Sequence, residues 1–224
     1  MGIKETVQRN ASYKDNDVYR PGAFNPGLFE LNKKKLKALR PQIFGLRLGQ
    51  KNIDTWQNVY TQLNDGDIQP ALVMSTKPLL VACYTDDMDA IAMLCFPEEL
   101  GRKMGWTAGR QLIVTAAYNN LFMKANKDLD CGPRNRGKFK AYGPIIADLY
   151  TDNTERLERK KREIPPEMWA YVEAQARQYI ANHPGMARNG LGYPYADAEP
   201  IEEIKFKNID LDKWCAYSTK HVEV

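Results

Sequence analysis

The chain has 224 residues, 43% of them hydrophobic and 27% charged, which is enough apolar material to bury a core without a structural metal or disulfide bonds. No apolar run approaches the roughly 18 to 20 residues that a membrane-spanning helix needs, and residues 1–17 lack the apolar segment of a signal peptide. These features argue against a membrane protein and predict a soluble, cytoplasmic one.

The net charge of +4 is distributed in blocks. Residues 1–50 carry 10 basic and 4 acidic side chains, residues 51–100 carry 2 and 8, residues 101–140 carry 9 and 2, and residues 141–224 carry 11 and 14. If the fold brings the two basic blocks together, they form a surface for phosphates or for an acidic partner. The alternative is that blocks of opposite sign neutralise each other across the fold.

The first 28 residues lack apolar periodicity and end in Pro-Gly turns, so we interpret them as a polar arm before a single domain over residues 29–224. Residues 29–39 favour a short helix whose solvated face carries Lys33, Lys34 and Lys35. Asn52 is a good N-cap for a second helix, in which apolar residues recur along one side at Ile53, Trp56, Val59, Tyr60 and Leu63.

Residues 71–97 form the most apolar stretch of the chain. The pattern predicts an antiparallel meander with strands at 71–75, 79–85 and 90–96. With the second turn at residues 86–89, one face carries Val81, Cys83, Ala92 and Leu94, and the other carries Ala82, Tyr84, Ile91 and Met93. Both faces are apolar, so we expect strands covered on both sides. Cys83 and Cys95 then lie on opposite faces, and we expect all four cysteines of the chain to be free thiols.

The next segments are less regular. Pro97, Glu98 and Glu99 favour the start of a short helix that ends before Gly105. Residues 111–118 favour a strand, although a helix continuing to Met123 also fits the pattern. Residues 124–144 are polar, basic and glycine-rich, which predicts the longest loop of the chain.

Helical signals dominate the C-terminal part. Residues 151–163 predict a charged surface helix, and residues 167–182 are the strongest helix of the sequence. Residues 201–206 alternate like an edge strand, and residues 211–217 favour a last short element. We therefore predict an α+β fold. An antiparallel sheet built on the 71–97 meander packs against the helices at 53–63 and 167–182, with a helical subregion from about residue 145.

One local pattern at the 86–89 turn suggests chemistry. Tyr84-Thr85-Asp86-Asp87 resembles the YxDD hairpin of reverse-transcriptase palm domains, in which a tight turn holds carboxylates where they bind Mg²⁺. The resemblance implies a metal site at Asp86, Asp87 and Asp89. A palm also needs an aspartate on an earlier strand, and we place the upstream candidates on or beside a helix: Asp54, Asp65 and Asp67. The alternative is that aspartates simply favour turns.

A second pattern lies in the basic loop. Residues 132–138 match the GxxxxGK spacing of a P-loop, but Phe139 replaces the Ser or Thr that binds Mg²⁺, and no buried strand precedes the motif. We interpret the segment as a flexible anion-binding loop in which Phe139 and Tyr142 are available for stacking. Its predicted anion ligands are Arg134, Arg136, Lys138 and Lys140. The alternative is a solvated loop or a protein contact.

Residue counts weigh against most catalytic mechanisms. The chain has two histidines and three serines, none of them in a GxSxG motif. We therefore favour a non-catalytic binding or regulatory protein without a cofactor, acting through protein contacts or self-association. The alternatives are a Mg²⁺-dependent enzyme acting on a nucleotide or phosphate ester, and a nucleic-acid-binding protein that uses the basic blocks.

Overall fold

The computed structural model describes residues 25–41, 50–119, 124–135 and 137–218. Its helices are α2 (Lys33–Leu39), α3 (Gln50–Asp65), α4 (Glu98–Met104), α5 (Thr154–Glu163), α6 (Pro166–Asn182) and α7 (Leu211–Ser218), with short 3₁₀ turns η2 (Ala147–Leu149) and η3 (Ile201–Glu203). Its strands are β1 (Asp67–Thr76), β2 (Leu79–Thr85), β3 (Ala90–Phe96), β4 (Gln111–Asn119), β5 (Ala141–Ile146), β6 (Met186–Asn189) and β7 (Glu199–Pro200). The predicted mixed α+β fold is confirmed.

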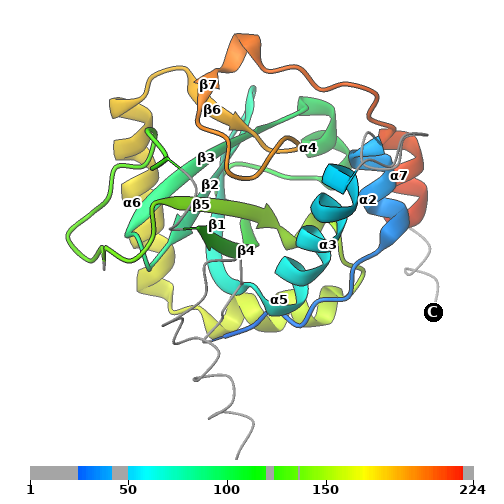
Figure 1. Cartoon of the computed structure of the whole chain (residues 1–224), viewed down its shortest axis with the longest axis horizontal. Helices are drawn as coiled ribbons and strands as arrows, with labels where there is room; N and C mark the ends of the chain where they lie inside the picture. Colours follow the sequence, from blue (N-terminus) through cyan, green and yellow to red (C-terminus); the bar gives the residue numbers. More distant parts are fainter. Residues whose placement is uncertain (1–24, 42–49, 120–123, 136, 219–224) are drawn as a thin grey trace, which may run out of the picture.

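The strands of the described residues form one sheet in the order β5-β4-β1-β2-β3-β6-β7 (Figure 1). All neighbouring strands are antiparallel except β3 and β6, which are parallel. The meander at β1–β2–β3 lies in the middle of this order, as expected from the apolar run. Its second hairpin pairs Val81 with Leu94 and Tyr84 with Ile91, which confirms the predicted register.

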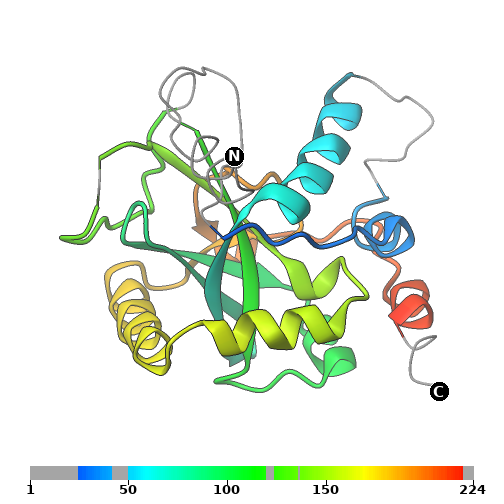
Figure 2. The same cartoon turned by 90° about the horizontal axis from the view of Figure 1, so that it is seen from below.

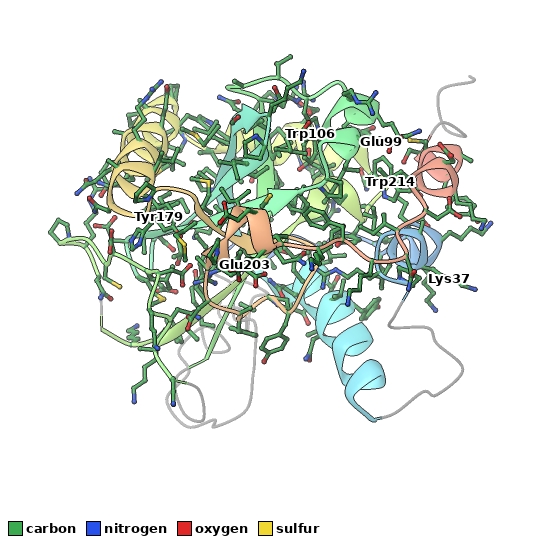
Figure 3. The ribbon with its side chains drawn as sticks, turned by 90° about the horizontal axis from the view of Figure 1, so that it is seen from above. Lys37, Glu99, Trp106, Tyr179, Glu203 and Trp214 are labelled. Carbon is green, nitrogen blue, oxygen red and sulfur yellow. The ribbon has the colours of Figure 1, made fainter. Side chains whose placement is uncertain are left out.

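Helices cover both faces of the meander, and the sheet curls between them (Figure 2). On one face, side chains of β1–β3 pack against α6 through Trp169, Val172, Ala176 and Tyr179. On the other face, the larger core contains Leu36 of α2, Leu63 of α3 and Trp214 of α7. Figure 3 shows Tyr179 and Trp214 at opposite ends of the molecule, which illustrates how widely the two cores spread. Cys83 and Cys95 belong to different cores and are free thiols.

The first helices differ from expectation in their exposed faces. Helix α2 begins after Asn32, whose side chain accepts hydrogen bonds from the N–H groups of Lys34 and Lys35. Lys35 is not on a solvated face. It is buried, and its Nζ donates to Thr151 O (2.9 Å) and pairs with Asp152 (2.7 Å). Tyr60 of α3 is half exposed rather than packed inward.

Two segments have a different secondary structure from the one predicted. Residues 201–206 are not an edge strand, because η3 occupies residues 201–203 and the edge is formed by β7. The expected long loop ends early at β5, which contains Gly143 and Pro144. Proline fits there because β5 is the edge strand beyond β4, where a missing N–H interrupts no second ladder. Residues 111–118 belong to strand β4 and not to a helix.

The polar arm expected at residues 1–28 lies mostly outside the described residues. Its last part is fastened to the body, because Gly27 N donates to Gly66 O (3.1 Å) and Leu28 N donates to Asn64 O (2.8 Å). Among the described helices, none combines the length and the apolar character needed to cross a membrane.

Candidate functional site

The 86–89 turn directs its carboxylates to two different places. Asp86 lies on the β1 side, where its Oδ1 accepts a hydrogen bond from Gln69 Nε2 (2.6 Å). Asp89 is fully buried and points toward α6 and the loop that follows residue 123. The carboxylates of Asp86 and Asp89 therefore face different partners and do not form one cluster. Asp87 lies beside them and is partly exposed.

Three donors from three elements surround the carboxylate of Asp89. Tyr84 Oη of β2 donates to Oδ1 (2.9 Å), Tyr171 Oη of α6 donates to the same oxygen (2.8 Å), and Arg134 N donates to Oδ2 (3.0 Å). Burial by itself raises the pKa of Asp89, but the hydrogen bonds from Arg134, Tyr171 and Tyr84 outweigh burial and hold the pKa below its ordinary value. Asp89 is thus an ionised anchor for the loop at neutral pH.

The backbone of Asp89 supports the same anchor. The residue has φ of 47°, in the left-handed region that aspartate and asparagine tolerate better than most residues. Its carbonyl oxygen accepts a hydrogen bond from Gly132 N (2.8 Å). A Cβ atom at Gly132 would lie 2.3 Å from Asp89 Oδ2, so only glycine fits this close approach of the loop to the turn.

Asp67 is the upstream carboxylate whose position the sequence interpretation did not resolve. It follows the end of α3, as expected, but it is also the first residue of β1, and its buried carboxyl group lies near the 86–89 turn. Gln69 Nε2 donates both to Asp67 Oδ2 (2.7 Å) and to Asp86 Oδ1 (2.6 Å). Burial and the neighbouring charge of Asp86 raise the pKa of Asp67 to about 7. One amide nitrogen therefore joins two carboxyl groups.

The described residues contain no group of three or more histidine, cysteine, aspartate or glutamate side chains arranged to hold a metal ion. Of the three predicted ligands, Asp86 and Asp89 face different partners. The metal hypothesis for Asp86, Asp87 and Asp89 stays a prediction, because its direct test is metal binding.

The loop at residues 124–140 is tied to the body at several points. Asn126 N donates to Lys140 O (2.9 Å), and the Asn126 side chain accepts from Tyr142 N (3.0 Å), which closes the base of the loop. Asp130 Oδ2 accepts from Asn182 Nδ2 (2.8 Å) and lies 3.0 Å from His183 Nε2, at the end of α6. The described part of the loop is therefore held by its own polar side chains.

The most buried of these ties is an ion pair. Arg188 of β6 makes a two-point contact with Asp128, from Nε to Oδ2 (2.7 Å) and from Nη2 to Oδ1 (2.8 Å). Arg188 Nη1 also donates to Tyr142 O (2.6 Å). Arg188 is 1% exposed and Asp128 is 5% exposed. Such a pair is costly to bury, and the two-point contact together with the hydrogen bond from Nη1 to Tyr142 O offsets that cost.

The predicted anion ligands differ in their surroundings. Arg134 is exposed, but its guanidinium stacks over the ring of Tyr171, 4.5 Å from the ring centroid. Lys138 and Lys140 are exposed. Arg136 lies outside the described residues. The structure thus places three of the four predicted ligands on the outer side of one loop.

The aromatic residues proposed for stacking already stack within the protein. Tyr118 of β4 stacks on Phe139 (centroids 4.5 Å apart) and on Tyr142 (5.8 Å). Tyr142 is completely buried, and its hydroxyl donates to Tyr84 O (2.9 Å). These rings attach the end of the loop to the sheet, and the buried ring of Tyr142 is not accessible to a base.

Sequence reasoning considered Asp67 without placing it on a strand, and it missed Asp128, Tyr171 and Arg188. Asp128 and Arg188 are 60 positions apart, so no local pattern joins them.

Comparisons with protein-family models, with curated protein sequences and with solved structures found no match to this chain.

Proposed function

We propose that this chain is a non-catalytic binding protein of the cytoplasm that contacts an acidic surface of a protein partner through the 124–140 loop. The observation that carries the proposal is the division of charge in this loop. The acidic group of Asp128 is buried and neutralised by Arg188, whereas the basic side chains of the described loop are exposed: Lys124, Lys127, Arg134, Lys138 and Lys140. Asp130 is the exposed acid of the loop and lies against the end of α6.

A loop that is already ordered suits recognition. Binding costs conformational entropy when a loop must be ordered by its partner, and the anchors at Asp89 and Asp128 reduce this cost in advance. Exposed charges of one sign then increase the association rate and select partners of opposite sign. The stacking of Phe139 and Tyr142 on Tyr118 supports a protein partner over single-stranded nucleic acid, because stacking on bases would compete with these contacts.

The proposal predicts that charge reversal in the loop weakens binding to an acidic polypeptide. Fluorescent poly-L-glutamate is titrated with the wild-type protein and with a Lys138→Glu/Lys140→Glu variant at low salt. We expect the variant to bind about tenfold more weakly, and wild-type affinity to fall as salt rises. Lys37→Glu/Lys77→Glu has the same change in net charge away from the loop, at helix α2 and at the β1–β2 turn, and should bind like wild type.

Three outcomes of this experiment would count against the proposal. Equal affinities for the two double variants would mean that net charge, and not the loop, governs binding. Much tighter binding to a single-stranded or duplex DNA oligonucleotide of equal charge would favour the nucleic-acid alternative, with its steep salt dependence. Light scattering that shows a dimer broken by the loop variant would identify the partner as a second copy of this chain.

A further inference from the structure

The start of β1 holds a pair of carboxyl groups that the proposed function does not use. Asp67 and Asp86 both accept hydrogen bonds from the same nitrogen atom, Gln69 Nε2, at 2.7 Å and 2.6 Å. Asp67 is buried and Asp86 is partly exposed. Two ionised carboxylates held apart by one amide repel each other, and burial adds a desolvation cost to the charge of Asp67.

Hydrogen bonds from the Gln69 side chain and the Asn25 N–H favour the charged form of Asp67, but they do not outweigh burial and the charge of Asp86, and the pKa of Asp67 stays raised. Asp87 of the same turn adds a further negative charge that raises the pKa of Asp67. Tyr118 of β4 and Tyr142 of β5 interact electrostatically with Asp67, and their own pKa values are raised above the ordinary value, so they stay neutral. Lys160 of α5 donates to the side chain of Asn25, the residue whose main-chain N–H donates to Asp67.

Asp67 also fastens the segment that enters the domain. Asn25 N donates to Asp67 Oδ1 (3.3 Å), Ile68 N donates to Asn25 O (3.2 Å), and Pro26 forms an isolated bridge with Asp67. The carboxyl group therefore joins residues 25–27, the start of β1 and the turn that carries Asp86. A change in its charge acts on all three.

We propose that Asp67, Gln69 and Asp86 form a proton-operated latch that holds residues 25–27 and the start of β1 against the β2–β3 turn. The latch is closed while Asp67 keeps its proton. Loss of the proton places two charged carboxylates on one amide, and the start of β1 loosens as Asp67 moves toward water. This device is independent of the partner proposed for the 124–140 loop.

The direction of the pH effect follows from the two protonation equilibria. The pKa of Asp67 is about 7 in the folded protein, and about 3.9 is ordinary for an exposed aspartate. Between these values the closed state binds more protons than the open state, so the closed state becomes less stable relative to the open state as pH rises from about 4 to about 7. Above about pH 7 the loss is complete and levels off.

The test is an NMR titration of the Asp67 carboxyl carbon, combined with hydrogen exchange of the Ile68 amide, which bonds to Asn25 O. In the wild type we expect Asp67 to titrate near pH 7 and the protection factor of Ile68 to fall by about tenfold or more between pH 5.5 and pH 7.5. Asp86→Asn keeps an acceptor for Gln69 but removes the charge, so the pKa of Asp67 should fall by about one unit or more. Asp67→Asn should make the protection of Ile68 independent of pH.

Each alternative result overturns the latch. Titration of Asp67 near pH 4 would show that burial and the charge of Asp86 do not keep the proton on Asp67. Titration near pH 7 with unchanged protection of Ile68 would show that the proton does not control the segment. A large fall of the Asp67 pKa on addition of millimolar MgCl₂ would assign the pair to a cation instead of a proton.

Discussion

Replacing Arg188 with methionine is expected to lower the free energy of unfolding by about 3 to 5 kcal/mol, because it leaves the carboxylate of Asp128 buried without its partner. Methionine fills much of the space of the arginine stem, so the loss of charge and hydrogen bonds dominates over the loss of packing. The main chain of β5 loses a donor as well, since Arg188 Nη1 binds Tyr142 O. Urea denaturation followed by circular dichroism measures the effect.

The matched control is an exposed ion pair in the same protein. Arg177 and Glu173 of α6 pair at 2.6 Å, but their side chains are 71% and 51% exposed. Water already solvates both charges, so Arg177→Met should cost no more than about 1 kcal/mol. The double variant Arg188→Met/Asp128→Leu should recover much of the stability lost in Arg188→Met, because it removes the stranded charge. Equal costs for the Arg188 and Arg177 variants would contradict the role assigned to burial.

Asp89→Asn is expected to destabilise the protein by about 2 to 3 kcal/mol, since an amide replaces a charged acceptor of three hydrogen bonds. Asparagine tolerates the left-handed backbone at this position, so the substitution tests the side chain and not the main chain. The amide has one oxygen and one NH₂ group in place of two oxygens. The NH₂ group therefore faces either the two tyrosine hydroxyls or Arg134 N, which donated to the carboxylate. Thermal or urea denaturation at pH 7 gives the difference from wild type.

The pH dependence of this difference provides a further check. The pKa of Asp89 is below its ordinary value, so its stabilisation is present above about pH 4 and is lost as pH falls through the folded pKa. Wild type and Asp89→Asn should therefore converge in stability in acid. Tyr171→Phe removes one hydroxyl donor and keeps the ring beneath Arg134, so it should cost only about 1 kcal/mol. A larger loss in Tyr171→Phe than in Asp89→Asn would refute the central place of the carboxylate.

The sequence predicts the centre of this fold well because one local rule governs it. In residues 79–96 every strand residue is buried, and the turn between the two strands is short, so the position of the turn sets the register of the hairpin. Helix α6 is predicted for a similar reason, since its buried side chains recur at helical spacing. Burial on both sides of the meander follows from these two patterns together.

Local rules fail where a distant partner decides. Lys35 looks like part of a solvated run of lysines. In the fold its ammonium group donates a hydrogen bond to the carbonyl oxygen of Thr151 and forms an ion pair with Asp152. Asp67 follows Asp65-Gly66, a strong signal for a turn, and only pairing with β4 makes it part of a strand. Nothing in the local sequence separates Asp89 from the other aspartates of the turn. The three groups that donate hydrogen bonds to its carboxylate come from β2, the 124–140 loop and α6.

Hydrogen exchange of the 124–135 loop tests the central claim most directly, namely that buried carboxylates hold this loop so that its basic side chains face outward. The amides of Asn126, Gly132 and Arg134 donate to Lys140 O, Asp89 O and Asp89 Oδ2. In the wild type they should exchange about 100-fold or more slowly than in an unstructured chain, and in Asp89→Asn the protection of Gly132 and Arg134 should fall while that of Asn126 is kept. Exchange of all three wild-type amides at the rate of an unstructured chain would contradict the account.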